Sequence, residues 1–76
     1  MSLTDTIRAA IEEKVPGSKA TVAGGGGHFN IEVVWSGFEG KSTLEKQRLV
    51  YSAIAHLMKG DDAPLHAVDS LITKTG

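Results

Sequence analysis

The sequence contains no cysteine. This absence excludes disulfides and thiolate nucleophiles, and it excludes any metal or iron–sulfur site that is ligated by the chain's own cysteines. If a cluster binds to this chain, another molecule must supply the sulfur ligands.

A strong net charge is also missing. The chain has 8 basic and 9 acidic residues, which give a formal net charge of −1. Such a chain produces no overall field that attracts nucleic acid. The charge is uneven only at 41–59, where four basic residues accompany one acidic residue. Polyanion binding therefore has support in that segment alone.

Long apolar runs are absent as well. No run approaches the roughly 20 residues needed to cross a bilayer, and residues 1–10 lack the continuous apolar core of a secretory signal. We expect a cytoplasmic protein that does not bind a membrane. A length of 76 residues predicts one domain over 1–76. A chain this short buries only about 60% of its unfolded surface, so a deep enclosed active site is not expected.

Hydrophobic periodicity predicts two helices and three strands in the order α-β-β-α-β. The elements are a helix at 4–15, strands at 19–23, 28–35 and 65–72, and a second helix from Ser42 to Gly60. Thr4 or Asp5 is expected to cap the first helix. Ser42 and Glu45 have the spacing of a capping box. The predicted fold class is therefore α+β.

Alternation along the second strand places four apolar residues on the covered face of the sheet, namely Phe29, Ile31, Val33 and Trp35. The second helix is expected to bury Leu44, Leu49, Val50, Ala53, Ile54, Leu57 and Met58. His56 lies within this helix, and we interpret it as a structural residue.

Two histidines stand at the starts of predicted strands. His28 begins the second strand and His66 begins the third. If these strands pair through the intervening helix, the connection is a crossover and the strands run parallel, with their first residues at the same edge. Such pairing would bring the two histidines near one another.

Four glycines at 24–27 directly precede His28. A phosphate-binding loop of the Walker type needs a lysine, a Ser or Thr and a helix after its glycines, whereas a histidine and a strand follow here. We interpret the glycines as a flexible hairpin loop, a permissive rim that lets a partner approach the sheet edge.

A second glycine pair, in GFEG at 37–40, matches the G-x-x-G of nucleic-acid-binding K-homology domains. Lys41, Lys46 and Arg48 follow it and form a candidate surface for DNA. The alternative is a solvated helix face or a surface for an acidic protein partner. Glu39 lies within the motif and would repel phosphate.

Several ordered motifs together resemble the BolA family. They are HF at 28–29, VVWSGFEGKS at 33–42, LEKQRLVY at 44–51 and LHAV at 65–68. The resemblance implies an α-β-β-α-β sandwich similar to a type II K-homology domain, with helices on one face of a three-stranded sheet. Many members have Arg-His-Arg at the start of the second helix, whereas this chain has Lys46, Gln47 and Arg48. In this respect the chain is similar to the IbaG-like branch.

The resemblance also implies a function. BolA proteins pair with monothiol glutaredoxins and share a bridged [2Fe-2S] cluster, to which the histidine of an I/V-H-A motif is a ligand. By resemblance that residue is His66 here. Many members have a second ligand in the loop between the first two strands, but 23–27 offers neither cysteine nor histidine. His28 is the nearest candidate, and the alternative is a residue of the polar strand face.

Other functions receive less support from the sequence. Some BolA proteins have been regarded as DNA-binding transcriptional regulators, which keeps Lys41, Lys46 and Arg48 as an alternative site. The chain has no Ser-His-Asp arrangement, no paired carboxylates in a plausible cleft and no cofactor fingerprint, so we predict no enzymatic activity. Alone, the chain is expected to be a monomer or a weak homodimer that holds no cluster.

Overall fold

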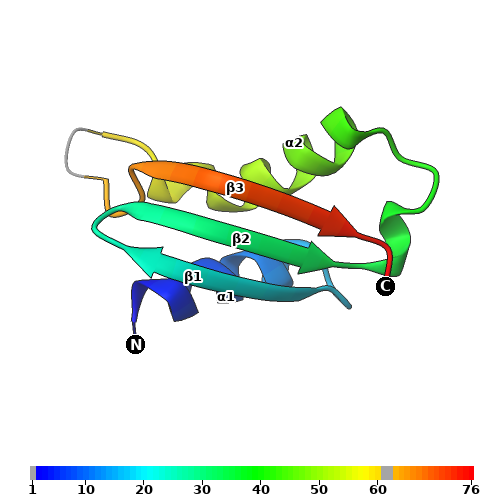
Figure 1. The fold of residues 1–76 in the computed structure, drawn as a ribbon, viewed down its shortest axis with the longest axis horizontal. Coiled ribbons are helices and arrows are strands. Elements are labelled where there is room, and N and C mark those ends of the chain that lie inside the picture. Colours follow the sequence, from blue (N-terminus) through cyan, green and yellow to red (C-terminus); the bar gives the residue numbers. More distant parts are fainter. Residues whose placement is uncertain (1, 61–62) are drawn as a thin grey trace.

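The structure, a computed structural model, describes residues 2–60 and 63–76. Its elements are α1 (Leu3–Lys14), β1 (Lys19–Gly25), β2 (His28–Val34), η1 (Ser36–Phe38), α2 (Thr43–Ile54), η2 (Ala55–Leu57) and β3 (Ala67–Lys74). The order α-β-β-α-β and the α+β class are confirmed. Both helices lie behind the same face of the sheet (Figure 1). No helix in the described ranges is long and apolar enough to span a bilayer.

The three strands form one sheet in the order β1-β2-β3. β1 and β2 are antiparallel, whereas β2 and β3 are parallel. The parallel pairing is the one expected for strands joined through a helix. On the helical side of β2, Phe29, Ile31 and Val33 are buried as the alternation predicts.

The buried residues form one cluster between the sheet and the helices. Its members are Ile7, Ile11, Ala20, Phe29, Ile31, Val33, Phe38, Val50, Ala53, Ile54 and Leu65. Trp35 is half-buried and packs against this cluster, and its ring meets that of Phe38 edge to face with centroids 5.2 Å apart. Both positions are therefore explained by packing.

The first helix begins earlier than its sequence indicates. Ser2 is the N-cap, and its hydroxyl accepts a hydrogen bond from the Asp5 N–H at 3.3 Å. The expectation of a cap at Thr4 or Asp5 is therefore wrong, because Ser2 supplies the same chemistry two or three residues before them. At the other end, the Glu12 carboxylate accepts from the Ala20 N–H at 3.0 Å and ties α1 to β1.

The second helix has the expected start but ends sooner. Ser42 and Glu45 form the capping box, with both reciprocal bonds present. The α-helix stops at Ile54 instead of continuing to Gly60, and η2 follows it. The Leu57 carbonyl accepts from the Leu65 N–H at 3.2 Å, which directs the chain back toward β3.

One position of the expected buried stripe is wrong. Leu44 is 54% exposed, whereas Val50 is fully buried. A helix turns about 100° per residue, so a residue six positions before Val50 lies about 120° around the axis from it. Lys46 and Gln47, four and three positions before Val50, are instead the half-buried ones.

The glycine segment is a tight turn and not an open loop. β1 extends through Gly25, which pairs with His28, so only Gly26 and Gly27 join the strands. Both have positive φ, +64° and +83°, as a two-residue type I′ turn requires. The expectation of a flexible rim at 24–27 is therefore corrected, because half of that segment belongs to the sheet.

The last strand begins two residues later than expected. β3 runs from Ala67 to Lys74 instead of over 65–72. Leu65 is buried completely in the core, which fixes the chain before the strand begins. His66 therefore stands immediately before β3, between a buried anchor and the first paired residue.

Candidate functional site

The parallel pairing of β2 and β3 brings the two histidines to one edge of the sheet. His28 is the first residue of β2 and is opposite Ala67, the first residue of β3. His66 directly precedes Ala67 in the chain. The expectation that His28 and His66 share an edge is thus confirmed, although His66 lies one residue outside the strand. Both side chains are exposed.

His66 is held against the glycine turn. The N–H groups of His66 and Ala67 both donate to the Gly27 carbonyl at 2.8 Å. The His66 ring lies over Gly27, so that a Cβ at Gly27 would overlap Cδ2 of the ring and stand only 2.9 Å from Cγ. Gly27 is accordingly buried. An alanine at this position would displace the imidazole.

His28 lies on the face of the sheet that the helices do not cover. Its neighbours Phe29 and Ile31 point into the core at alternating positions, while the His28 ring is exposed and its Nδ1 is 3.2 Å from Oδ1 of Asp69. His28 therefore has a hydrogen-bond partner at this edge, and its role as a ligand stays a prediction.

The two imidazoles are nitrogen ligands of a kind that iron accepts, but among the described residues they do not form part of a complete metal site. Among the described residues, no group of three or more His, Cys, Asp or Glu side chains is arranged to hold a metal ion. A [2Fe-2S] cluster takes four ligands besides its own sulfides, and two histidines on one iron are a known combination. His66 and His28 could supply nitrogen ligands to one iron, while the remaining ligands would come from a partner.

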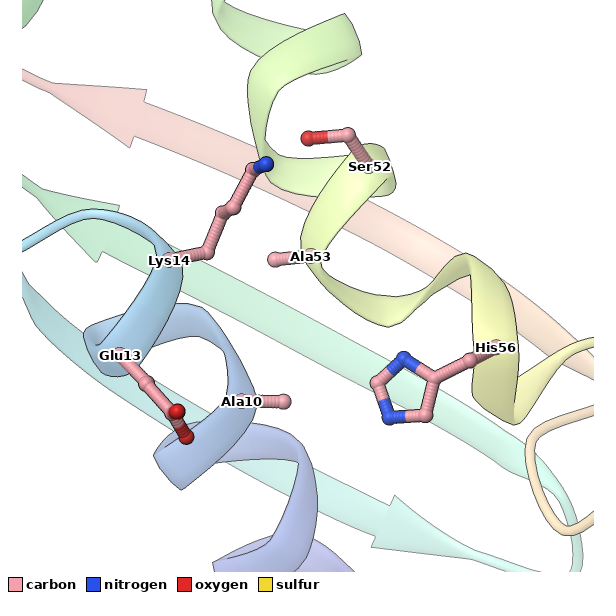
Figure 2. Close-up of a pocket in the computed structure, with 6 residues that line it drawn as sticks. All are labelled: Ala10, Glu13, Lys14, Ser52, Ala53 and His56. Carbon is pink, nitrogen blue, oxygen red and sulfur yellow. The ribbon is translucent and has the colours of Figure 1, made fainter.

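A groove between the helices is a second candidate site. Figure 2 shows its lining residues, which come from α1, α2 and η2: Ala10, Glu13, Lys14, Ser52, Ala53 and His56. His56 is exposed here and lines the groove, and its interpretation as a structural residue stays a prediction. His56 belongs to η2, the short turn of helix that follows α2.

The groove contains a serine, a histidine and a carboxylate, but their bonding does not prepare a nucleophile. The Ser52 hydroxyl donates to the Leu49 carbonyl at 2.6 Å, within its own helix. A catalytic serine instead donates to a base. In the described part of the chain, no hydrogen bond joins Ser52 to His56.

The basic residues lie at the start of α2. Lys41 and Arg48 are exposed and Lys46 is half-buried. The GFEG segment before them owes its shape to packing, since Phe38 is fully buried within η1. Glu45 lies on the same turn of α2, and hydrogen bonds from the Ser42 backbone and hydroxyl, with a smaller effect of Lys41, lower the pKa of its carboxyl. DNA binding at this surface stays a prediction.

Two contributions to the edge site were not anticipated from the sequence. Asp69 contacts His28 through an irregularity in β3, and Gly27 provides the surface for His66. The run of glycines drew attention to Gly27, but the sequence did not indicate that Gly27 contacts His66. Nothing in the local pattern around Asp69 indicated an irregular strand.

Comparisons with known proteins identify relatives over nearly the whole chain. The family model described as BolA-like protein matches residues 6–75. BolA-like protein 1 of Mus musculus is 42% identical over 52 residues, which are 68% of this chain and 36% of that relative. The chain thus spans little more than a third of the relative's length.

Solved structures agree with this match. A BolA homologue from Coxiella burnetii has 37% identity and a TM-score of 0.80, with 99% of this chain and 92% of that chain covered. The BolA domain of SufE1 from Arabidopsis thaliana has 26% identity and a TM-score of 0.76, with 99% and 93% covered. The sequence motifs, the topology and these matches agree, and the chain belongs to the BolA family.

Proposed function

We propose that this protein is a non-enzymatic accessory protein that binds a monothiol glutaredoxin and shares a bridged [2Fe-2S] cluster with it. The cluster is the cargo, in iron–sulfur assembly, in trafficking or in iron and redox regulation. A cytoplasmic location, as expected from the sequence, is part of this proposal.

One observation supports the proposal most. The exposed imidazoles of His66 and His28 share an edge of the sheet, in a chain that has no cysteine. Imidazole nitrogen is a suitable ligand for iron. Because the chain can offer only nitrogen here, the thiolate ligands would come from the glutaredoxin cysteine and its bound glutathione.

The fixed position of His66 adds to this support. Its backbone N–H and that of Ala67 are both bonded to Gly27, and its ring rests on the same glycine. A ligand that is already held in place loses less conformational entropy when it binds. His66 is therefore expected to be the principal ligand from this chain.

Co-purification with a monothiol glutaredoxin and glutathione tests the proposal. The complex should show the visible absorption and circular dichroism of a [2Fe-2S] cluster, and His66→Ala should change or abolish these bands. His56→Ala is the matched control, because His56 is also an exposed histidine but lies in the groove between the helices. Cluster spectra that are the same for wild type and His66→Ala would remove the proposal.

A further inference from the structure

Asp69 occupies an irregular position in β3. Phe29 is opposite Val68 in the parallel register, whereas the next residue of β2, Asn30, is opposite Ser70. Asp69 is therefore an extra residue in β3, which makes a β-bulge. Bulges often occur next to functional sites, where they change the direction of a side chain.

The bulge leaves two adjacent side chains of β3 exposed. Ser70 donates to the Asn30 side chain at 3.0 Å, while the Asp69 carboxylate reaches Nδ1 of His28 at 3.2 Å. The side chains of His28 and Asp69 are 60% and 55% exposed. Ion pairs between groups this exposed contribute little to stability. The main effect of this contact is therefore on the orientation of the His28 ring.

The contact also determines which nitrogen of His28 is available. When a neutral imidazole donates its Nδ1–H to a carboxylate, the remaining lone pair is on Nε2. Metal-binding histidines commonly make such a bond with their other ring nitrogen, which fixes the tautomer and the orientation of the ring. His28 has this arrangement in the protein alone.

We propose that Asp69 is a positioning residue that prepares His28 to bind iron through Nε2, as the second ligand beside His66. The inference rests on the proposed function, because the iron belongs to the cluster shared with glutaredoxin. Of the two interpretations of His28, a cluster ligand or a residue of the polar strand face, the inference favours the ligand.

The first test uses the protein without a cluster. Long-range 1H–15N spectra of the imidazole rings, at a pH where they are neutral, should show the His28 proton on Nδ1. Asp69→Ala should shift His28 toward the Nε2–H tautomer, and Asp69→Asn, which keeps an acceptor oxygen, should restore the wild-type signal. Ser70→Ala is the control, since Ser70 is exposed and adjacent but bonded to Asn30. An unchanged His28 signal in Asp69→Ala overturns the positioning role.

The second test uses the complex with a monothiol glutaredoxin and glutathione. Pulsed paramagnetic resonance of the reduced cluster should show two nitrogen couplings in wild type and one in His28→Ala. Asp69→Ala should shift or weaken the same coupling that His28→Ala removes. His66→Ala should remove the other coupling.

The two failures are distinguishable. Wild-type complex without cluster bands, or bands that His66→Ala leaves unchanged, would overturn the proposed function and with it the ligand role of His28. A cluster that responds to His66→Ala but keeps both nitrogen couplings in His28→Ala would overturn this inference alone.

Discussion

The imidazole of His66 lies on Gly27, in the space that a side chain at Gly27 would occupy. Gly26, its neighbour in the turn, also has a positive φ, but a Cβ at Gly26 would meet nothing within 4 Å. A substitution at Gly26 therefore introduces backbone strain alone, whereas a substitution at Gly27 introduces backbone strain and overlap with His66.

We expect Gly26→Ala to lower the free energy of unfolding by about 1–2 kcal/mol, the usual cost of a left-handed conformation for a residue with a Cβ. Gly27→Ala should cost more, because the new methyl group also displaces the His66 ring. Urea denaturation of both variants measures the difference.

A double-mutant cycle identifies the source of the extra cost. In a His66→Ala background the ring is absent, so the cost of Gly27→Ala should fall toward that of Gly26→Ala. Equal costs of Gly27→Ala in the two backgrounds would show that the ring does not rest on this glycine.

The capping box of α2 predicts a specific dependence on pH. The Ser42 backbone N–H, followed by the Ser42 hydroxyl, holds the pKa of Glu45 below its usual value. A carboxyl whose pKa is lower in the folded state stabilises the fold above its unfolded pKa, and this contribution disappears as the pH falls through the folded pKa. In thermal unfolding, the melting temperature of the wild type should thus be higher than that of Glu45→Gln at neutral pH. The difference between the two melting temperatures should become smaller as the pH falls. A gap that is constant with pH would contradict this account.

Two isoleucines on the strands test which face of the sheet packs against the helices. Ile31 is 2% exposed and faces the helices, whereas Ile72 is 48% exposed on the opposite face. Ile31→Val should cost about 0.5–1.5 kcal/mol, as is typical for the loss of one buried methylene. Ile72→Val should change stability by less than about 0.5 kcal/mol. Similar losses for the two variants, measured by urea denaturation, would contradict this difference in burial.

The alternative of DNA binding makes a quantitative prediction. Lys41, Lys46 and Arg48 can neutralise at most three phosphates, so the slope of log K against log salt should be about −2.7 or shallower. Arg48→Glu should reduce the magnitude of the slope by about 0.9, the value for one phosphate contact. Lys14→Glu, in the last turn of α1, is the control and should leave the slope unchanged. Binding that Arg48→Glu leaves unaffected would exclude this surface.

The sequence was sufficient for the order of the elements and for the edge shared by His28 and His66. Periodicity identifies buried strands and helices, and the crossover through α2 leaves parallel pairing as the ordinary solution. The position of Leu44 shows where this reasoning stops. The sequence pattern predicts that this apolar residue of the first helical turn is buried, although its angle around the helix axis directs it away from the core.

The finer parts of the site depend on contacts between distant segments. The end of α2 and the late start of β3 both involve Leu65, which bonds to Leu57 and fills the core. The bulge at Asp69 is defined only by the register against β2. No local propensity encodes such a register, so these features required the structure.

The parallel pairing of β2 with β3 also affects the order of folding. The hairpin of β1 and β2 is local, whereas β3 must return across α2, and contacts between distant segments generally form later. We therefore expect His66 to reach Gly27 in the last stage of folding, after the hairpin is complete. Pulse-labelling hydrogen exchange should show late protection of the Ala67 N–H, which is bonded to Gly27. A chain that has not finished folding would then keep its two histidines apart, and under the proposed function it could not offer both of them to a cluster.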